Sequence, residues 1–325
     1  MQKVFYRPQI IEEAAASSLT PARKAQGKKP GLNLILEILV TFAIFFMSVI
    51  CEGVALNIGE LLAAMTTKLE PSGKVFGIFE PAVFEEMFYL FGTVVSTVVV
   101  VASAMFITRR RLRTFGFVKK NAVKHYLIGL ALGAGMFVAA IGICALTGSV
   151  SITYAGGANV FYLILIFMGY MLQGNSEEVA CRGFTMVSIS RRYPVWVGVI
   201  YNSVFFAALH LFNPGIGALP IVNLILFGIL MSLVFLKTGN IWLVSALHTS
   251  WNFVQGNVFG VLVSGGTPSV SILSTAPTEL KDLINGGAFG LEGGIAVTIV
   301  VTIAILIVAF VVKPCEEGAA DSPNG

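Results

Sequence analysis

The chain has 325 residues, of which 56% are hydrophobic and only 12% are charged. Soluble domains carry about 25% charged residues, so this composition has too little charge for the surface of a water-soluble protein. It also excludes a disordered chain, which would need low hydrophobicity and high charge. We therefore expect a multi-spanning membrane protein.

Long runs without charged residues mark the expected membrane-spanning helices, each of which needs about 20 apolar residues. The lengths of these runs predict about eight helices, at residues 32–58, 88–107, 126–147, 159–190, 194–212, 217–237, 240–262 and 292–312. The first contains Glu37 and Glu52, and we expect Glu37 to snorkel to one membrane surface. The predicted fold class is an all-α polytopic membrane protein, a bundle of about eight transmembrane helices.

The remaining segments flank or interrupt this bundle. Residues 1–31 are predicted to be a basic cytoplasmic tail, 32–313 the transmembrane helical domain, and 314–325 a disordered cytoplasmic tail. Residues 75–91, which are rich in Phe with glutamates interleaved, predict an interfacial amphipathic segment with Glu85 and Glu86 on an exposed face. Residues 264–290 are rich in Gly, Ser, Thr and Pro and predict an outer loop. The four cysteines have no paired spacing and are expected to be reduced thiols.

The basic residues predict the orientation in the membrane. If the N-terminus is cytoplasmic, 18 of the 21 Lys and Arg residues lie on or towards the cytoplasmic side, and only Lys68, Lys74 and Lys281 lie outside. Because cytoplasmic loops carry an excess of Lys and Arg, eight spans with both termini inside are favoured. The same asymmetry explains the net charge of +4 without a nucleic-acid partner.

Ionisable and amide side chains gather inside three of the predicted spans. A charge at the centre of a membrane costs about 2.5–3.5 kcal/mol, so such residues are functional candidates. The candidates are Glu177, Glu178 and Arg182 on the fourth span, His210 on the fifth, and His248 and Asn252 on the seventh.

Helical geometry relates these residues to one another. Glu177 and His210 each lie 16 residues from the turn between the fourth and fifth spans, which puts both about 24 Å from it. His248 and Asn252 are shallower by this count. Glu178 and Arg182 are four residues apart, with the acid first, which favours an ion pair. Arg182 can then neutralise Glu178 while Glu177 points elsewhere.

These residue types suit hydrolysis without a metal or cofactor, and none is predicted. A buried carboxylate can take a proton from water, and an imidazole can hold that water. A second imidazole and an amide can stabilise the developing oxyanion. Cys181 lies nearby, but nothing obvious would activate its thiol.

Three motifs occur in order within the predicted spans: Glu177-Glu178-x-x-x-Arg182, Phe206-x-x-x-His210 and His248-x-x-x-Asn252. Over about residues 159–255 they resemble the CAAX prenyl protease / bacteriocin-processing family of intramembrane glutamic endopeptidases, also called the Abi family. The resemblance marks this region as the catalytic core helices. It implies a helical bundle around a conical cavity open to the membrane or the cytosol.

The resemblance also implies roles for the six residues. Glu177 would be the general base, His210 would act on the same water, and His248 with Asn252 would form the oxyanion site. Glu178 and Arg182 would support them. The implied partners are the lipid bilayer and a membrane-associated or lipidated peptide or protein substrate. The composition of the spans and the lack of a retrieval signal favour a bacterial plasma membrane.

Other functions remain open at this stage. Glu177, Glu178, His210 and His248 would suit a zinc-dependent membrane protease. Buried acids could instead serve as relays in a transporter. A membrane scaffold or bacteriocin-immunity protein on a protease-like fold is a further alternative. In the plainest interpretation, the same side chains form only a structural ion pair and interhelical hydrogen bonds.

Overall fold

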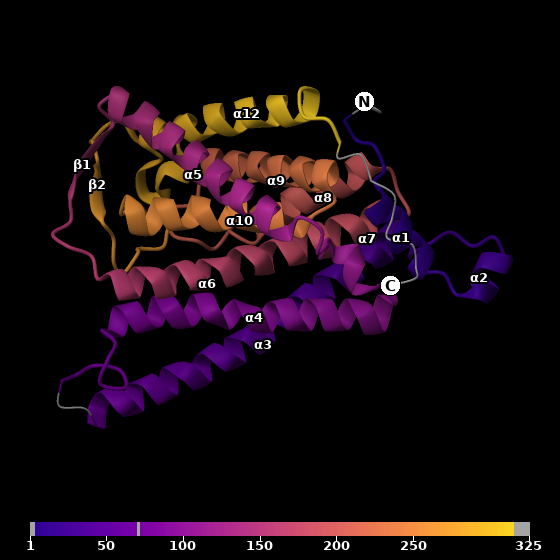
Figure 1. Ribbon diagram of the computed structural model, residues 1–325, viewed down its shortest axis with the longest axis horizontal. Helices are drawn as coiled ribbons and strands as arrows, with labels where there is room; N and C mark the ends of the chain where they lie inside the picture. Colours follow the sequence, from indigo (N-terminus) through magenta and orange to yellow (C-terminus); the bar gives the residue numbers. More distant parts are fainter. Residues whose placement is uncertain (1–3, 70–71, 315–325) are drawn as a thin grey trace.

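A computed structural model describes residues 4–69 and 72–314, which are mostly helical (Figure 1). The α-helices are α1 Gln9–Ser17, α2 Pro21–Ala25, α3 Leu34–Leu69, α4 Pro81–Thr108, α5 Ala122–Leu146, α6 Val160–Glu178, α7 Val187–Ser190, α8 Val195–Ala208, α9 Ala218–Thr238, α10 Ile241–Phe253, α11 Asp282–Asn285 and α12 Ile295–Phe310. Two π-helical segments, η2 Val179–Met186 and η3 Val254–Val258, extend α6 and α10. Short 3₁₀ turns occur at η1 Leu112–Phe115, η4 Gly287–Phe289 and η5 Leu291–Gly293.

Each of the eight predicted segments contains a helix. Of the described helices, α3, α4, α5 and α9 are long and apolar enough to span a membrane, and α8 and α12 are shorter apolar helices. Large apolar side chains along α3 are exposed, including Leu39, Phe42 and Phe46. Such a surface suits lipid rather than water. The chain is therefore an integral membrane protein, and the count of eight spans stays a prediction.

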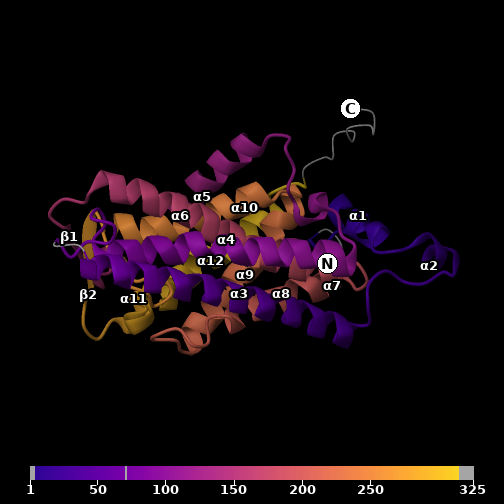
Figure 2. The same ribbon diagram turned by 90° about the horizontal axis from the view of Figure 1, so that it is seen from below.

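The long helices run up and down, so their connections gather at two ends of the molecule (Figures 1 and 2). We call the end that holds residues 72–80, 147–159, 209–217 and 259–294 the strand end, because two short strands lie there. The opposite end holds residues 109–121, 191–194 and 239–240 and is called the basic end. The described part of the N-terminal tail also lies at the basic end.

The strands are the clearest departure from the all-α prediction. β1 Val150–Tyr154 pairs antiparallel with β2 Leu273–Pro277, with Val150 opposite Pro277. Val, Ile, Thr and Tyr favour extended backbone, and this segment lies between the predicted spans 126–147 and 159–190. The predicted outer loop 264–290 contains β2, α11 and the 3₁₀ turn η4.

Other predicted boundaries shift for local reasons. α4 begins at Pro81, a residue suited to the first turn of a helix, so most of the predicted interfacial segment belongs to this helix. α3 continues to Leu69, about three turns beyond its predicted end at residue 58. Residues 315–325, most of the predicted disordered tail, lie outside the described residues.

The N-terminal region is folded in part. α1 buries Ile10 and Ile11, and the Arg7 guanidinium donates to the carbonyl of Arg191 at 2.6 Å. The expectation that Glu37 snorkels is wrong: its side chain is buried and forms an ion pair with Arg191. Buried charges are stable only when paired, so this contact fixes the start of α3 against α7.

α5 and α10 pack closely because glycines face α10. A Cβ atom on Gly133 would lie 2.1 Å from the carbonyl oxygen of Leu247, and one on Gly129 would lie 2.3 Å from that of Leu243. Small residues let membrane helices approach in this way. The contact sets the position of α10, which carries His248.

Candidate active site

The first part of the site lies where α6 passes into the π-helical segment η2. The Glu178 carboxylate accepts a hydrogen bond from Arg182 at 2.9 Å, and both side chains are fully buried. The Arg182 guanidinium also lies 4.8 Å from the ring centroid of Phe206. The predicted Glu178–Arg182 pair is therefore present, and Glu177 remains free to turn towards other groups. π-helical turns are often found at functional sites.

α10 lies in close contact with α6. The Thr249 hydroxyl donates to the carbonyl of Tyr170 at 3.1 Å, and a Cβ atom on Gly174 would lie 3.0 Å from the backbone nitrogen of Thr249. Because the helices touch here, the residue before Thr249, His248, lies beside the two glutamates.

His248 contacts both glutamates. Its Nδ1 atom lies 2.9 Å from Oε1 of Glu178, and its Nε2 atom lies 3.8 Å from Oε2 of Glu177. A carboxylate only accepts, so Nδ1 donates to Glu178 and Nε2 faces Glu177. The second contact exceeds hydrogen-bond length, a spacing across which polar groups are often bridged by water. Oε2 of Glu177 is buried and has no hydrogen-bond partner among the described protein groups.

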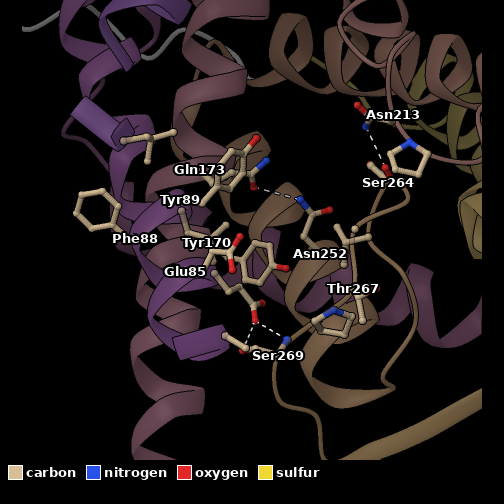
Figure 3. Close-up of a pocket in the computed structure, with 18 of the residues that line it drawn as sticks. Glu85, Phe88, Tyr89, Tyr170, Gln173, Asn213, Asn252, Ser264, Thr267 and Ser269 are labelled. Atoms are coloured by element: carbon tan, nitrogen blue, oxygen red, sulfur yellow. Dashed lines mark hydrogen bonds between the residues drawn. The ribbon is translucent and has the colours of Figure 1, made fainter. Parts of the chain in front are cut away.

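Gln173, which was not among the predicted site residues, links Asn252 to Glu177. The Asn252 amide donates to Oε1 of Gln173 at 3.1 Å (Figure 3), and the Gln173 amide donates to Oε1 of Glu177. Gln173 therefore fixes the carboxylate and the Asn252 amide relative to each other. Its one signal in the sequence is a polar side chain one helical turn before Glu177, after a mostly apolar stretch of the span.

His210 lies just beyond the end of α8. Its Nδ1 atom is 2.9 Å from the carbonyl oxygen of Phe206, which only accepts, so Nδ1 carries the proton. In the neutral ring Nε2 is then an acceptor. His210 and Glu177 line the same cavity, but no hydrogen bond or ion pair between them is present in the described chain. Glu177 and His210, predicted to lie at equal depth, thus line one cavity.

The cavity that contains these groups has a volume of about 1290 Å³, which is large for a small-molecule pocket. Glu177, His210, His248 and Asn252 all line it. Its walls include the second half of α3, the first part of α4, and the loop at residues 263–269.

Two glutamates hold the 263–269 loop over the cavity. Glu86 accepts from the backbone and the hydroxyl of Ser269, and Glu292 accepts from both groups of Ser264. The expected exposed face of residues 85 and 86 is thus correct for Glu85 and wrong for Glu86, which is half-buried. The sequence shows that Glu85 and Glu86 are adjacent. It does not show that the distant 263–269 loop contacts Glu86.

Arg110 has contacts that the sequence did not indicate. In the sequence it counted only as one of the cytoplasmic charges. It is 2% exposed, and its guanidinium donates to the carbonyls of Gly183 and Phe184 at 2.6 and 3.1 Å. These carbonyls belong to the π-helical segment η2. Arg110 thus supports the segment that carries Arg182.

The donor set does not favour a resident metal. In the described ranges no three His, Cys, Asp or Glu side chains are grouped so that they could hold an ion. Oε1 of Glu178 is engaged by Arg182 and by Nδ1 of His248. The four residues considered as zinc ligands therefore do not converge on one point.

Comparison with known families agrees with the motifs. Residues 159–254 match the family model described as Type II CAAX prenyl endopeptidase Rce1-like, which confirms the resemblance inferred from the sequence. The match covers α6 to α10 and includes the Glu177, His210 and His248 motifs. No curated protein and no solved structure gives a match to the chain.

Proposed function

We propose that this chain, whose residues 159–254 match the Rce1-like type II CAAX prenyl endopeptidases, is an intramembrane endopeptidase that uses Glu177 to activate water. The observation that carries this is the buried Oε2 atom of Glu177, which faces the cavity without a partner 3.8 Å from Nε2 of His248. A water between these atoms would be polarised by both. The substrate is a segment of a membrane-associated or lipidated peptide or protein, and the membrane is a bacterial plasma membrane.

The steps follow from the hydrogen-bonding capacity of each group. Glu177 takes a proton from water as the water oxygen attacks the peptide carbonyl carbon. Nε2 of His210 accepts from the same water and orients it. The tetrahedral intermediate then collapses, the C–N bond breaks, and Glu177 returns the proton to the leaving amine.

The oxyanion of that intermediate needs donors. The Asn252 amide has two N–H groups, and one of them is used by Gln173, so the other is available. His248 donates from Nε2 when it is protonated, since Nδ1 is held by Glu178. Losing one oxyanion donor typically costs about 100- to 1,000-fold in turnover.

Cells that produce the wild-type chain or Glu177→Gln provide the test. Peptide and protein termini from the two membranes are compared by mass spectrometry, with Glu12→Gln as a control, because Glu12 is exposed on α1 away from the cavity. We expect termini that are present with wild type and Glu12→Gln and absent with Glu177→Gln. Identical termini from all three would contradict the proposal and favour a transporter or an immunity-type protein.

Treatment with a chelator distinguishes the proposed mechanism from that of a zinc-dependent protease. We expect purified wild-type protein to keep its activity after treatment with EDTA or 1,10-phenanthroline, because Glu178 is already engaged by Arg182 and His248. Loss of activity that zinc restores would favour the metalloprotease instead.

A further inference from the structure

His210 lies in a turn, so the packing of a regular helix does not hold it in place. α8 ends at Ala208, and residues 209–217, which we call the histidine turn, continue without regular structure. The Phe206 carbonyl fixes the imidazole, and the backbone N–H of Asn213 donates to the carbonyl of His210 at 3.0 Å. The position of Nε2 of His210 therefore depends on the contacts that hold this turn.

The 263–269 loop holds the histidine turn. The side-chain amide of Asn213 donates to the carbonyl of Ser264 at 2.9 Å (Figure 3). The next residue of the loop, Gly265, lies against the turn so closely that a Cβ atom on it would be 2.4 Å from the carbonyl oxygen of Pro214. A displacement of the loop would therefore be passed on to the segment that carries the imidazole.

Glu292 holds the loop from its other side. Its Oε2 atom accepts from the backbone N–H of Ser264 at 2.7 Å and from the hydroxyl of Ser264 at 3.1 Å. Ser264 has a φ angle of 48°, a left-handed conformation that is uncommon for residues other than glycine. The two hydrogen bonds stabilise Ser264 in this conformation, so the shape of the loop depends on the carboxylate.

The same carboxylate contacts α10. Its Oε1 atom accepts from the indole N–H of Trp251 at 3.3 Å. Trp251 precedes Asn252, and its ring is buried against Phe137 and Phe227, with ring centroids 5.4 and 5.5 Å away. One side chain thus binds both the helix that carries Asn252 and the loop that holds the histidine turn.

The backbone of Glu292 is fixed independently of its side chain. The buried amide of Asn223, on α9, donates to the carbonyl of Glu292 at 2.7 Å and to that of Gly294 at 2.9 Å. Oδ1 of Asn223 accepts from the hydroxyl of Thr298, on α12, at 2.6 Å. A change confined to the carboxylate therefore leaves these backbone contacts in place.

We propose that Glu292 is a positioning residue that fixes His210 and Asn252 relative to each other. Both of its carboxylate oxygens are engaged by protein donors, so it acts through Ser264 and Trp251 although it lines the cavity. Glu292 lies outside residues 159–254, which match the family model. The effect on hydrolysis rests on the proposed function, whereas the effect on the position of His210 does not.

The position of His210 can be measured without activity. The chain has three histidines, so purified protein labelled with ¹³C at histidine Cε1 gives three imidazole signals, and His210→Ala and His125→Ala assign two of them. A glutamine has one acceptor oxygen where Glu292 uses two, so we expect Glu292→Gln to shift the His210 signal and leave that of His125 in place. Glu279→Gln, at an exposed residue outside the cavity lining, should shift neither. An unmoved His210 signal in folded Glu292→Gln would overturn the proposal.

Kinetics test whether this position matters for the reaction. The probe is a quenched fluorescent peptide that spans the cleavage site identified from the compared termini. We expect Glu292→Gln to lower kcat by up to about 100-fold, the cost of a misplacement of about 1 Å, with little change in KM. Glu279→Gln should keep both constants. A wild-type kcat in Glu292→Gln, or a change confined to KM, would overturn the proposal.

Asn213→Ala cuts the same connection at its other end. Asn213 is only partly buried and the substitution leaves no charge unpaired, so this variant serves if Glu292→Gln does not fold. We expect it to shift the His210 signal and lower kcat, and the double variant to lose clearly less than the product of the two single losses. Losses that multiply would show that the two residues act separately and would overturn the proposal.

The two measurements also separate this proposal from the protease function. If the wild-type chain cleaves no peptide while Glu292→Gln still shifts the His210 signal, the protease function is refuted and the positioning by Glu292 is supported. If the wild-type chain cleaves the peptide and Glu292→Gln changes neither the signal nor kcat, the positioning role is refuted and the protease function stands.

Discussion

Nδ1 of His248 lies 2.9 Å from Oε1 of Glu178, the same carboxylate oxygen that accepts the Arg182 guanidinium. The second glutamate of the motif thus links a buried cation to an imidazole of the site. Glu178 is not among the residues that line the cavity, so in the proposed mechanism it can act only through His248. The two adjacent glutamates thus have different surroundings, since Glu177 lines the cavity and Glu178 is buried behind it.

Removing Glu178 should destabilise the protein. Glu178→Ala leaves Arg182 buried without a counter-charge, which typically costs about 3–5 kcal/mol. Thermal unfolding in detergent measures this, with Glu13→Ala as the control, because the Glu13–Arg113 pair is partly exposed and such pairs contribute little. Equal melting temperatures for Glu178→Ala and the wild type would contradict the buried pair.

Gln173 is expected to act as a positioning residue. Gln173→Met keeps the side-chain length but removes both hydrogen bonds, so Glu177 and Asn252 lose their relative alignment. Misplacement of about 1 Å can cost about 100-fold in rate, and we expect kcat to fall while KM changes little. Gln26→Met, at an exposed site, should leave both constants unchanged. A change in KM alone would indicate that Gln173 serves substrate binding instead.

Arg110 should be needed for the stability of η2. Arg110→Ala removes hydrogen bonds to the carbonyls of Gly183 and Phe184, and hydrogen bonds to charged groups contribute about 1.5–3 kcal/mol each. Arg111→Ala is the matched control, since Arg111 is adjacent and exposed. We expect a clear loss of thermal stability for Arg110→Ala alone. Similar melting temperatures for the two variants would mean that Arg110 serves only membrane orientation.

The α5–α10 contact offers a matched pair of glycine substitutions. A Cβ on Gly133 would lie 2.1 Å from the Leu247 carbonyl oxygen, whereas one on Gly135 has nothing within 4 Å. Overpacking costs about 1–3 kcal/mol, and it would also displace α10 beside His248. We therefore expect Gly133→Ala to lose stability and activity, while Gly135→Ala keeps both. Tolerance of Gly133→Ala would show that this contact does not position His248.

The sequence predicted much of the helical framework, because charge-free runs report apolar length directly. Val150–Tyr154 lay outside the predicted spans, but the strand could not be predicted, because its pairing partner Leu273–Pro277 lies in a distant segment of the chain. The end of α3 was missed because the predicted span stopped before the charged Glu60, although glutamate favours helical backbone and Glu60 lines the cavity. The order of residues along the chain does not reveal which of them line a cavity.

The sequence predicted which residues belong to the candidate site, but it did not predict the contacts between them. Counting residues made His248 shallower than Glu177, on the assumption that all helices begin at one level. α10 begins inside the protein instead, where Asn240 is 1% exposed and the Ile241 amide donates to the carbonyl of Gly116 at 2.9 Å. This recessed start brings His248 to the glutamates, and it depends on tertiary packing with η1 that no local pattern encodes.

The most direct test of the central claim is peptide hydrolysis by purified Glu177→Gln, assayed on the substrate identified from the compared termini. The variant keeps the size of the side chain and its contact with Gln173 but cannot take a proton from water. Glu12→Gln and a melting temperature for each protein control for folding. We expect folded Glu177→Gln to lose hydrolysis while Glu12→Gln keeps the wild-type rate. Hydrolysis by Glu177→Gln at the wild-type rate would contradict the account.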